Sequence, residues 1–331
     1  MRAAVVGVGA VGARCARQLL TVAGLDELVL LDVRTGRAEA VVGSLGAPAR
    51  ASSEAAVDLV GRVDVAVLAL PADQHRVLAE RCLTGGTDVV SVVDDATAAA
   101  QLLDLDSEAR ERGRTIVVGA GFSPGLTCLL ARHAASEFSA IDEIHLAKTG
   151  TGGPACARQH HAALAAEAAD WRDGAWVRRP AGSGRELCFF PDPVGGLDCY
   201  RTAAADPVLL RGAFPGATRI TARMSASRRD RVTARLPMLR RPHAEGAIGA
   251  VRVEVRGRRA AATDARVLGA IDRPAVAAGA VAAIAAAWAA EGRFARTGAA
   301  GLAELAPEPV PFLAALAECG VRAAVFEGAD A

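Results

Sequence analysis

The stretch Gly7-Val8-Gly9-Ala10-Val11-Gly12 decides the fold, because it places the pattern G-x-G-x-x-G between an apolar run and a helix-compatible segment. The apolar run covers residues 2–6, and residues 13–20 suit a helix. In such a unit the first glycine permits the tight turn, the second lets the backbone approach a pyrophosphate, and the third brings helix and strand close together. We therefore predict a dinucleotide site at Gly7, Gly9, Ala10, Val11 and Gly12.

Asp32 ends the next apolar run, twenty residues after Gly12. A carboxylate at this distance binds the 2′-hydroxyl of an adenine ribose and repels a 2′-phosphate, which favours NAD. Arg34 and Arg37 could instead bind that phosphate, so NADP is the alternative cofactor.

Strand-like and helix-like segments alternate as far as residue 122. The expected strands cover residues 2–6, 28–31, 47–51, 63–70, 88–93 and 114–118. This order predicts an α/β fold with a doubly wound parallel sheet, a Rossmann domain. Ligands of such sheets bind beyond the carboxyl ends of the strands. The residues expected there, in addition to the glycine turn, are Leu70, Pro71, His75, Asp94, Asp95, Gly121 and Phe122.

The character of the chain changes near residue 140. Residues 141–148 and 251–256 alternate as strands of an antiparallel sheet, which predicts a second, α+β domain that binds the substrate. We place the dinucleotide domain at 1–122 and the substrate and dimerisation domain at 123–299, with 300–331 packed back onto the first. The Ala-rich run at 275–290 predicts a buried helix, with a subunit contact as the alternative, and we expect a homodimer.

Charge and cysteine usage exclude several classes of protein. The 331 residues carry a net charge of +1, which gives no bulk attraction to nucleic acid or to a membrane. The twelve arginines of residues 219–259 lack interleaved aromatic residues, so a solvated sheet face or subunit contact is favoured over a nucleic-acid surface. Seven scattered cysteines without C-x-x-C indicate free thiols in a reducing cytoplasm. The adjacent His160 and His161 cannot share a helix face, and we predict no metal site.

Lys148 is the only lysine in a chain rich in arginine. A position that keeps lysine can require an amine able to lose its proton, which a guanidinium cannot do, although chance survival is the alternative. We therefore predict Lys148 as the catalytic base, or else as the partner of a substrate carboxylate. Asp95 is the second candidate, as a group that binds the substrate ammonium, but Asp94 or Asp95 could equally cap the next helix.

Several of these motifs together make the chain resemble the saccharopine dehydrogenase-like family, which includes saccharopine reductases and lysine 6-dehydrogenases. The residues that carry the resemblance are the glycine turn at 7–12, Leu70-Pro71 with His75, residues 78–83, residues 90–95, residues 121–126 and, more loosely, residues 273–279. Between residues 151 and 259 only the turn Gly152-Gly153-Pro154 is similar. The resemblance implies hydride transfer between a nicotinamide and the carbon of a C–N bond in an amino acid.

The sequence thus predicts a cytoplasmic NAD(P)-dependent oxidoreductase that acts on the amine or imine of an amino acid-like substrate. The expected substrate contacts are Asp94, Gly152 and Gly153, since a helix start can hold a carboxylate. Tyr200, the only tyrosine, could line the pocket or belong to the core. His75 could contact the nicotinamide ribose or lie on a helix surface. The alternatives are a non-catalytic dinucleotide-binding scaffold or sensor, and a dehydrogenase of the same fold acting on a carbonyl or hydroxyl group.

Overall fold

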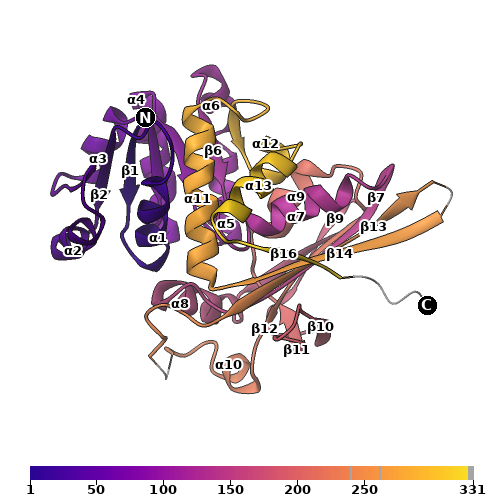
Figure 1. The fold of residues 1–331 in the computed structure, drawn as a ribbon. Coiled ribbons are helices and arrows are strands. Elements are labelled where there is room, and N and C mark those ends of the chain that lie inside the picture. The colour runs from indigo at the N-terminus through magenta and orange to yellow at the C-terminus, as the bar shows by residue number, and fades with distance from the viewer. Residues whose placement is uncertain (239–240, 261, 327–331) are drawn as a thin grey trace.

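The protein has two sheets with helices packed around them (Figure 1). The structure is a computed structural model, and it describes residues 1–238, 241–260 and 262–326. The first sheet is parallel and has the strand order β15-β6-β5-β4-β1-β2-β3. Its strands are β1 (Arg2–Val6), β2 (Glu27–Leu31), β3 (Ala49–Ala51), β4 (Val65–Leu68), β5 (Asp88–Ser91), β6 (Thr115–Val118) and β15 (Gly298–Ala300). The predicted doubly wound Rossmann sheet is confirmed.

The central strands are apolar on both faces because helices cover both sides of the sheet. All four residues of β4 and of β6 are buried, as expected for strands inside a parallel sheet. The helices are α1 (Ala10–Leu19), α2 (Thr35–Leu45), α3 (Ala56–Leu59), α4 (His75–Gly85), α5 (Ala96–Leu103) and α6 (Asp106–Glu111). The sequence predicts one helix over residues 97–112, but the structure has two, α5 and α6, which are separated at Asp104–Leu105.

The Ala-rich helix α11 (Pro274–Ala290) belongs to the first sheet rather than to the substrate domain. It packs beside α1 and against β4 and β5 (Figure 1). The approach is close because the residues are small: a Cβ atom on Gly279 would lie 2.6 Å from Arg14 Cβ. The helix is thus buried within the chain itself. The chain returns to the first domain at residue 274, earlier than the predicted boundary at 300.

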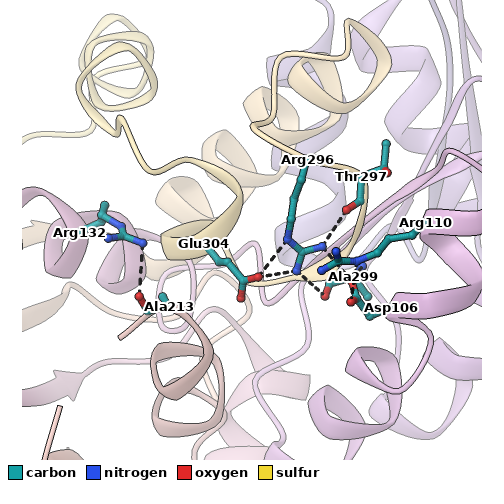
Figure 2. A network of polar contacts seen from close by, with 8 residues as sticks. All are labelled: Asp106, Arg110, Arg132, Ala213, Arg296, Thr297, Ala299 and Glu304. Atoms are coloured by element: carbon teal, nitrogen blue, oxygen red, sulfur yellow. Dashed lines mark hydrogen bonds and ion pairs between the residues drawn. The ribbon is translucent and has the colours of Figure 1, made fainter. Parts of the chain in front are cut away.

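Polar contacts hold the segment that follows α11 against the first domain (Figure 2). Arg296 Nη1 donates to Asp106 Oδ1 at 2.8 Å, and the amide of Ala299 donates to the same oxygen at 2.8 Å. Arg296 also pairs with Glu304, so one guanidinium connects α6 to the helix α12 (Leu302–Leu305). These contacts hold β15 beside β6 at the edge of the first sheet.

The second sheet is mixed and has nine strands. Its main order is β10-β11-β12-β7-β13-β14-β16, and β8 pairs with both β12 and β9. The strands are β7 (Ala140–Thr149), β8 (Glu167–Arg172), β9 (Ala175–Pro180), β10 (Glu186–Phe189), β11 (Gly196–Arg201), β12 (Arg219–Ser225), β13 (Gly249–Arg259), β14 (Ala262–Asp272) and β16 (Ala323–Phe326). The helices α8 (Pro154–Ala163), α9 (Asp206–Ala213) and α10 (Arg228–Val232) accompany it.

The last described residues contact both domains. The helix α13 (Val310–Glu318) packs on α11, in agreement with the expected return to the first domain. The strand β16 instead pairs with β14 at the edge of the second sheet. Residues 323–326 thus extend the second sheet, a contact that the sequence analysis above does not include.

The helix α7 (Leu126–Ala135) starts later than the sequence suggests. The pair Ser123-Pro124 predicts a helix start with Ser123 as its cap, but the hydroxyl of Ser123 donates to the buried carboxylate of Asp206 at 3.0 and 3.1 Å. Gly125, with φ of +122°, precedes the helix instead. Within the described part of the chain, no helix has both the length and the hydropathy required to cross a membrane.

Candidate active site

The glycine turn between β1 and α1 has the geometry that a dinucleotide requires. A Cβ atom on Gly7 would lie 2.3 Å from the carbonyl oxygen of Ala69, and one on Gly12 would lie 1.9 Å from that of Gly7. Both positions therefore exclude any side chain. A Cβ atom on Gly9 would meet nothing within 4 Å, because Gly9 faces a cavity at the start of α1. This open surface, with the free N–H groups of a helix start behind it, fits a pyrophosphate.

Asp32 is held firmly at the end of β2. Its Oδ2 accepts from the amide of Val8 at 2.9 Å, and its Oδ1 accepts from the amide of Arg34 at 2.9 Å. Its side chain is only 6% exposed, and Arg37 Nη1 lies 3.6 Å from Oδ2. Asp32 borders a second cavity of about 560 Å³, together with residues 52–57 and the start of α4.

The main cavity, of about 490 Å³, joins the glycine turn to the second domain. Of the predicted residues it is lined by Gly9, Ala10, Val11, Gly12, Arg34, Leu70, Asp94, Gly121, Phe122, Lys148 and Gly152. It is also lined by Ser123, Cys156, Arg158 and His160, which the sequence analysis did not select. The carboxyl ends of the first-sheet strands therefore face the end of β7 and the start of α8.

Lys148 lies near the end of β7, and its side chain enters this cavity. The side chain is 8% exposed. Its ammonium donates to the carbonyl oxygen of Ser123 at 3.2 Å, and it lies 4.0 Å from Asp94 Oδ2. Lys148 is thus held between the two domains, with one carboxylate beside it.

His160 and Cys156 complete the cluster. They are four residues apart and therefore lie on one face of α8. His160 Nε2 lies 3.1 Å from Asp94 Oδ2 and 3.5 Å from Cys156 Sγ. The signal that could have identified them is the C-x-x-x-H spacing directly after Gly152-Gly153-Pro154, at the domain boundary.

The cluster has unusual protonation behaviour. Burial alone would lower the pKa of His160, but the neighbouring Cys156 and Asp94 raise it to about 9. Burial would raise the pKa of Asp94, yet the hydrogen bond from His160 and the charge of Lys148 lower it below its usual value. Burial also opposes the Cys156 thiolate, and the charge of His160 outweighs this and lowers that pKa. At neutral pH the site thus contains a carboxylate next to an imidazolium.

Asp95 does not share this position. Its Oδ1 accepts from the amide of Ala98 at 2.8 Å, which makes it the N-cap of α5. The capping alternative therefore describes Asp95, because its carboxylate is bound to the start of the helix. Asp94 is the acid that reaches the main cavity. His161, next to His160, points the other way and donates to the carbonyls of Thr233 and Leu236.

Pro71, Gly153 and Tyr200 also lie outside the main cavity. Pro71 lies after the end of β4 and directly before the turn that leads into α4. Gly153 comes directly before α8, where a Cβ atom would lie 2.8 Å from Ala10 Cβ, so it sets the closeness of the two domains. Tyr200 is buried in the second domain under Arg231, whose guanidinium carbon lies 4.0 Å from the ring centroid. Its core alternative is therefore the one the structure supports.

His75 is buried and does not line the main cavity, so the alternative of a surface residue is wrong. It is 1% exposed, its Nε2 donates to the carbonyl of Leu70 at 3.1 Å, and its Nδ1 accepts from Ser91 Oγ at 2.8 Å. Burial lowers the pKa of its imidazole. The neutral ring joins the ends of β4 and β5 beneath the cavity floor.

This buried neutral histidine predicts a loss of stability in acid. Because the folded pKa lies below the unfolded value of about 6.5, stability is complete above that pH and falls as the pH decreases towards the folded pKa. The expected slope from His75 is about 1.4 kcal/mol per pH unit. Urea unfolding of His75→Asn between pH 7 and 5 is expected to show a smaller decrease than the wild type. His243 is exposed, so His243→Asn serves as the control and should lose as much stability as the wild type over this pH range. If His75→Asn also lost as much stability as the wild type, the assignment would be contradicted.

Comparisons with known proteins agree with this geometry. Residues 1–120 match the model of an oxidoreductase family described as having an NAD-binding Rossmann fold. A saccharopine dehydrogenase (L-Glu forming) from Saccharomyces cerevisiae superposes with a TM-score of 0.72 at 15% identity, covering 98% of this chain and 99% of that one. An amine dehydrogenase from Mycobacterium smegmatis has a TM-score of 0.54 at 13% identity, covering 92% and 96%. No curated protein matches the sequence.

Residues 1–120 thus have the NAD-binding Rossmann fold of an oxidoreductase family. More particularly, the whole chain has the two-domain fold of saccharopine dehydrogenase. The resemblance drawn from the sequence is thereby confirmed at the level of the fold.

Proposed function

We propose that the protein transfers hydride to or from the carbon of a C–N bond in an amino acid-like substrate. The observation that carries this proposal is the single cavity that joins the glycine turn to Lys148 and Asp94. A substrate between these groups would have its nitrogen beside a lysine and a carboxylate. It would also have a carbon within reach of a nicotinamide held by the first domain.

Bound NAD supplies the hydride chemistry, and the chain supplies position and proton handling. An amine must be neutral before its carbon can lose hydride, so a group that accepts its proton is required. We assign this role to the amine of Lys148, whose Nζ is positioned by the carbonyl of Ser123 and which becomes the ammonium described above once it has accepted the proton. Asp94 would bind the substrate ammonium. Arg158 lines the cavity on α8 and would, with the start of that helix, attract the substrate carboxylate.

The test follows the absorbance of the reduced nicotinamide during incubation with NAD⁺ and a panel of amino acids. The reverse direction uses NADH with keto acid–amine pairs, and a matched panel contains hydroxy acids and polyols. We expect turnover with an amino acid or with a keto acid–amine pair, and none with the hydroxyl compounds. Turnover confined to the hydroxyl panel would transfer the proposal to the carbonyl–hydroxyl alternative. Tight NADH binding without any turnover would indicate the non-catalytic scaffold.

The neighbouring acids Asp94 and Asp95 offer a matched pair of variants. Asp94→Asn removes the charge that faces Lys148, so we expect KM for the amine substrate to rise about tenfold, from the loss of one charge-assisted contact of about 1.4 kcal/mol. Asp95→Ser keeps a capping oxygen at the start of α5, and we expect KM within about twofold of the wild type. Steady-state kinetics on both variants check this, and an equal rise in KM would contradict the separation of roles.

A further inference from the structure

Three donor atoms of different chemistry meet at one end of the main cavity. They are a carboxylate oxygen of Asp94, Cys156 Sγ and His160 Nε2, and all lie within 4.8 Å of one another. Two of them come from one face of α8, and the third follows the end of β5. The fold thus brings together donors from both domains.

The arrangement differs from that of a proton relay. In a relay, the two partners of a histidine are bound by its two different ring nitrogens. Here both contacts involve the same nitrogen, Nε2. Three donor atoms of the S, N and O types that lie this close together are instead the pattern of a metal site.

We propose that Asp94, Cys156 and His160 form a three-ligand site for Zn²⁺, with the fourth coordination position open to the main cavity. Zinc accepts S, N and O donors at about 2.0–2.3 Å in tetrahedral geometry. In that geometry the N and O ligands are about 3.3 Å apart, and the S and N ligands about 3.6 Å. The observed distances of 3.1 and 3.5 Å are close to these values. The assignment replaces the expectation of no metal and does not depend on which reaction the protein catalyses. A metal bound to Asp94 would compete with the substrate ammonium that the proposed function places at the same carboxylate.

Lys148 limits the affinity of this site. Its ammonium lies 4.0 Å from Asp94 Oδ2, so a bound cation would be repelled by a buried positive charge. Removal of that charge should therefore strengthen metal binding, whereas the same change should abolish the proposed proton transfer. This opposite response separates the metal site from the dehydrogenase activity.

The experiment titrates the metal-free full-length chain with Co²⁺, which adopts the same geometry as zinc and gives an absorption band when bound to a thiolate. We expect one saturable Co²⁺ per chain, displaced by Zn²⁺. Cys156→Ser should lose the band, and His160→Gln should bind at least about tenfold more weakly. Cys319→Ser, which removes a thiol that does not line the cavity, should keep the wild-type titration. Lys148→Met should bind Co²⁺ about tenfold more tightly.

A wild type without the cobalt–thiolate band, or a band that persists in Cys156→Ser, would overturn the site. Circular dichroism of each variant verifies that it is folded, and His160→Gln provides an independent measurement if Cys156→Ser is not. NADH fluorescence titrations of the same variants measure whether the dinucleotide still binds. Cobalt binding without any dehydrogenase turnover would leave the metal site intact and reject only the proposed function.

Discussion

Lys148→Arg is expected to bind NADH within about twofold of the wild-type affinity and to lose at least about a hundredfold in kcat. The first result follows because Lys148 lies in the second domain, outside the glycine turn and the Asp32 segment. The second follows because a guanidinium stays protonated near neutral pH and cannot accept a proton from the substrate amine. General acid–base groups typically contribute 10²–10⁴-fold, which sets the expected size.

The change keeps the positive charge, so it separates proton transfer from binding of a substrate carboxylate. If Lys148 only pairs with that carboxylate, Lys148→Arg should raise KM and leave kcat nearly unchanged. Arg158→Lys is the matched control, since it makes the reverse exchange on another side chain of the same cavity. Single-turnover kinetics with saturating NAD⁺ distinguish the two cases. Retained kcat in Lys148→Arg would remove this residue from the mechanism.

The first domain could be predicted from the sequence because its signals are local. A glycine turn, short apolar runs and a single acid at a fixed distance each have one structural meaning, and they agree with one another. The roles of the side chains at the ends of the strands were harder to predict from the sequence. Whether Asp94 or Asp95 faces the cavity depends on which of them caps α5, a difference of one residue.

The site's second half depends on contacts between segments distant in the sequence. Asp94 and His160 are 66 residues apart, and nothing in the sequence near either residue indicates that they meet. Ser123 was expected as a helix cap, but the buried Asp206, 83 residues further on, binds its hydroxyl. The small residues of α11 correctly predicted that this helix is buried. They could not predict which helix it packs on, because an alanine surface can pack on any helix. Such pairings arise from the packing of the two domains.

Asp32→Ala is expected to weaken NAD⁺ binding about a hundredfold. A charge-assisted hydrogen bond to a ribose hydroxyl contributes about 1.5–3 kcal/mol, and each 1.4 kcal/mol corresponds to a tenfold change in affinity. The variant also removes the acceptor for the Val8 amide, which helps to shape the glycine turn. For NADP⁺ the loss should be much smaller, because the carboxylate that repels the 2′-phosphate is removed as well.

The comparison of both cofactors decides between Asp32 and the neighbouring arginines. Arg37→Gln removes a charge 3.6 Å from Asp32 Oδ2 and is expected to leave NAD⁺ affinity within about threefold, since Asp32 keeps its two backbone donors. If NADP is the natural cofactor, the pattern reverses: Arg37→Gln weakens NADP⁺ strongly, and Asp32→Ala leaves NAD⁺ almost unchanged. Calorimetric titration of the wild type and both variants with each dinucleotide gives four ratios of dissociation constants, one for each variant and dinucleotide relative to the wild type. Asp32 follows the end of β2 and Arg37 lies in the first turn of α2, so the preference is set by which of these two side chains the ribose contacts.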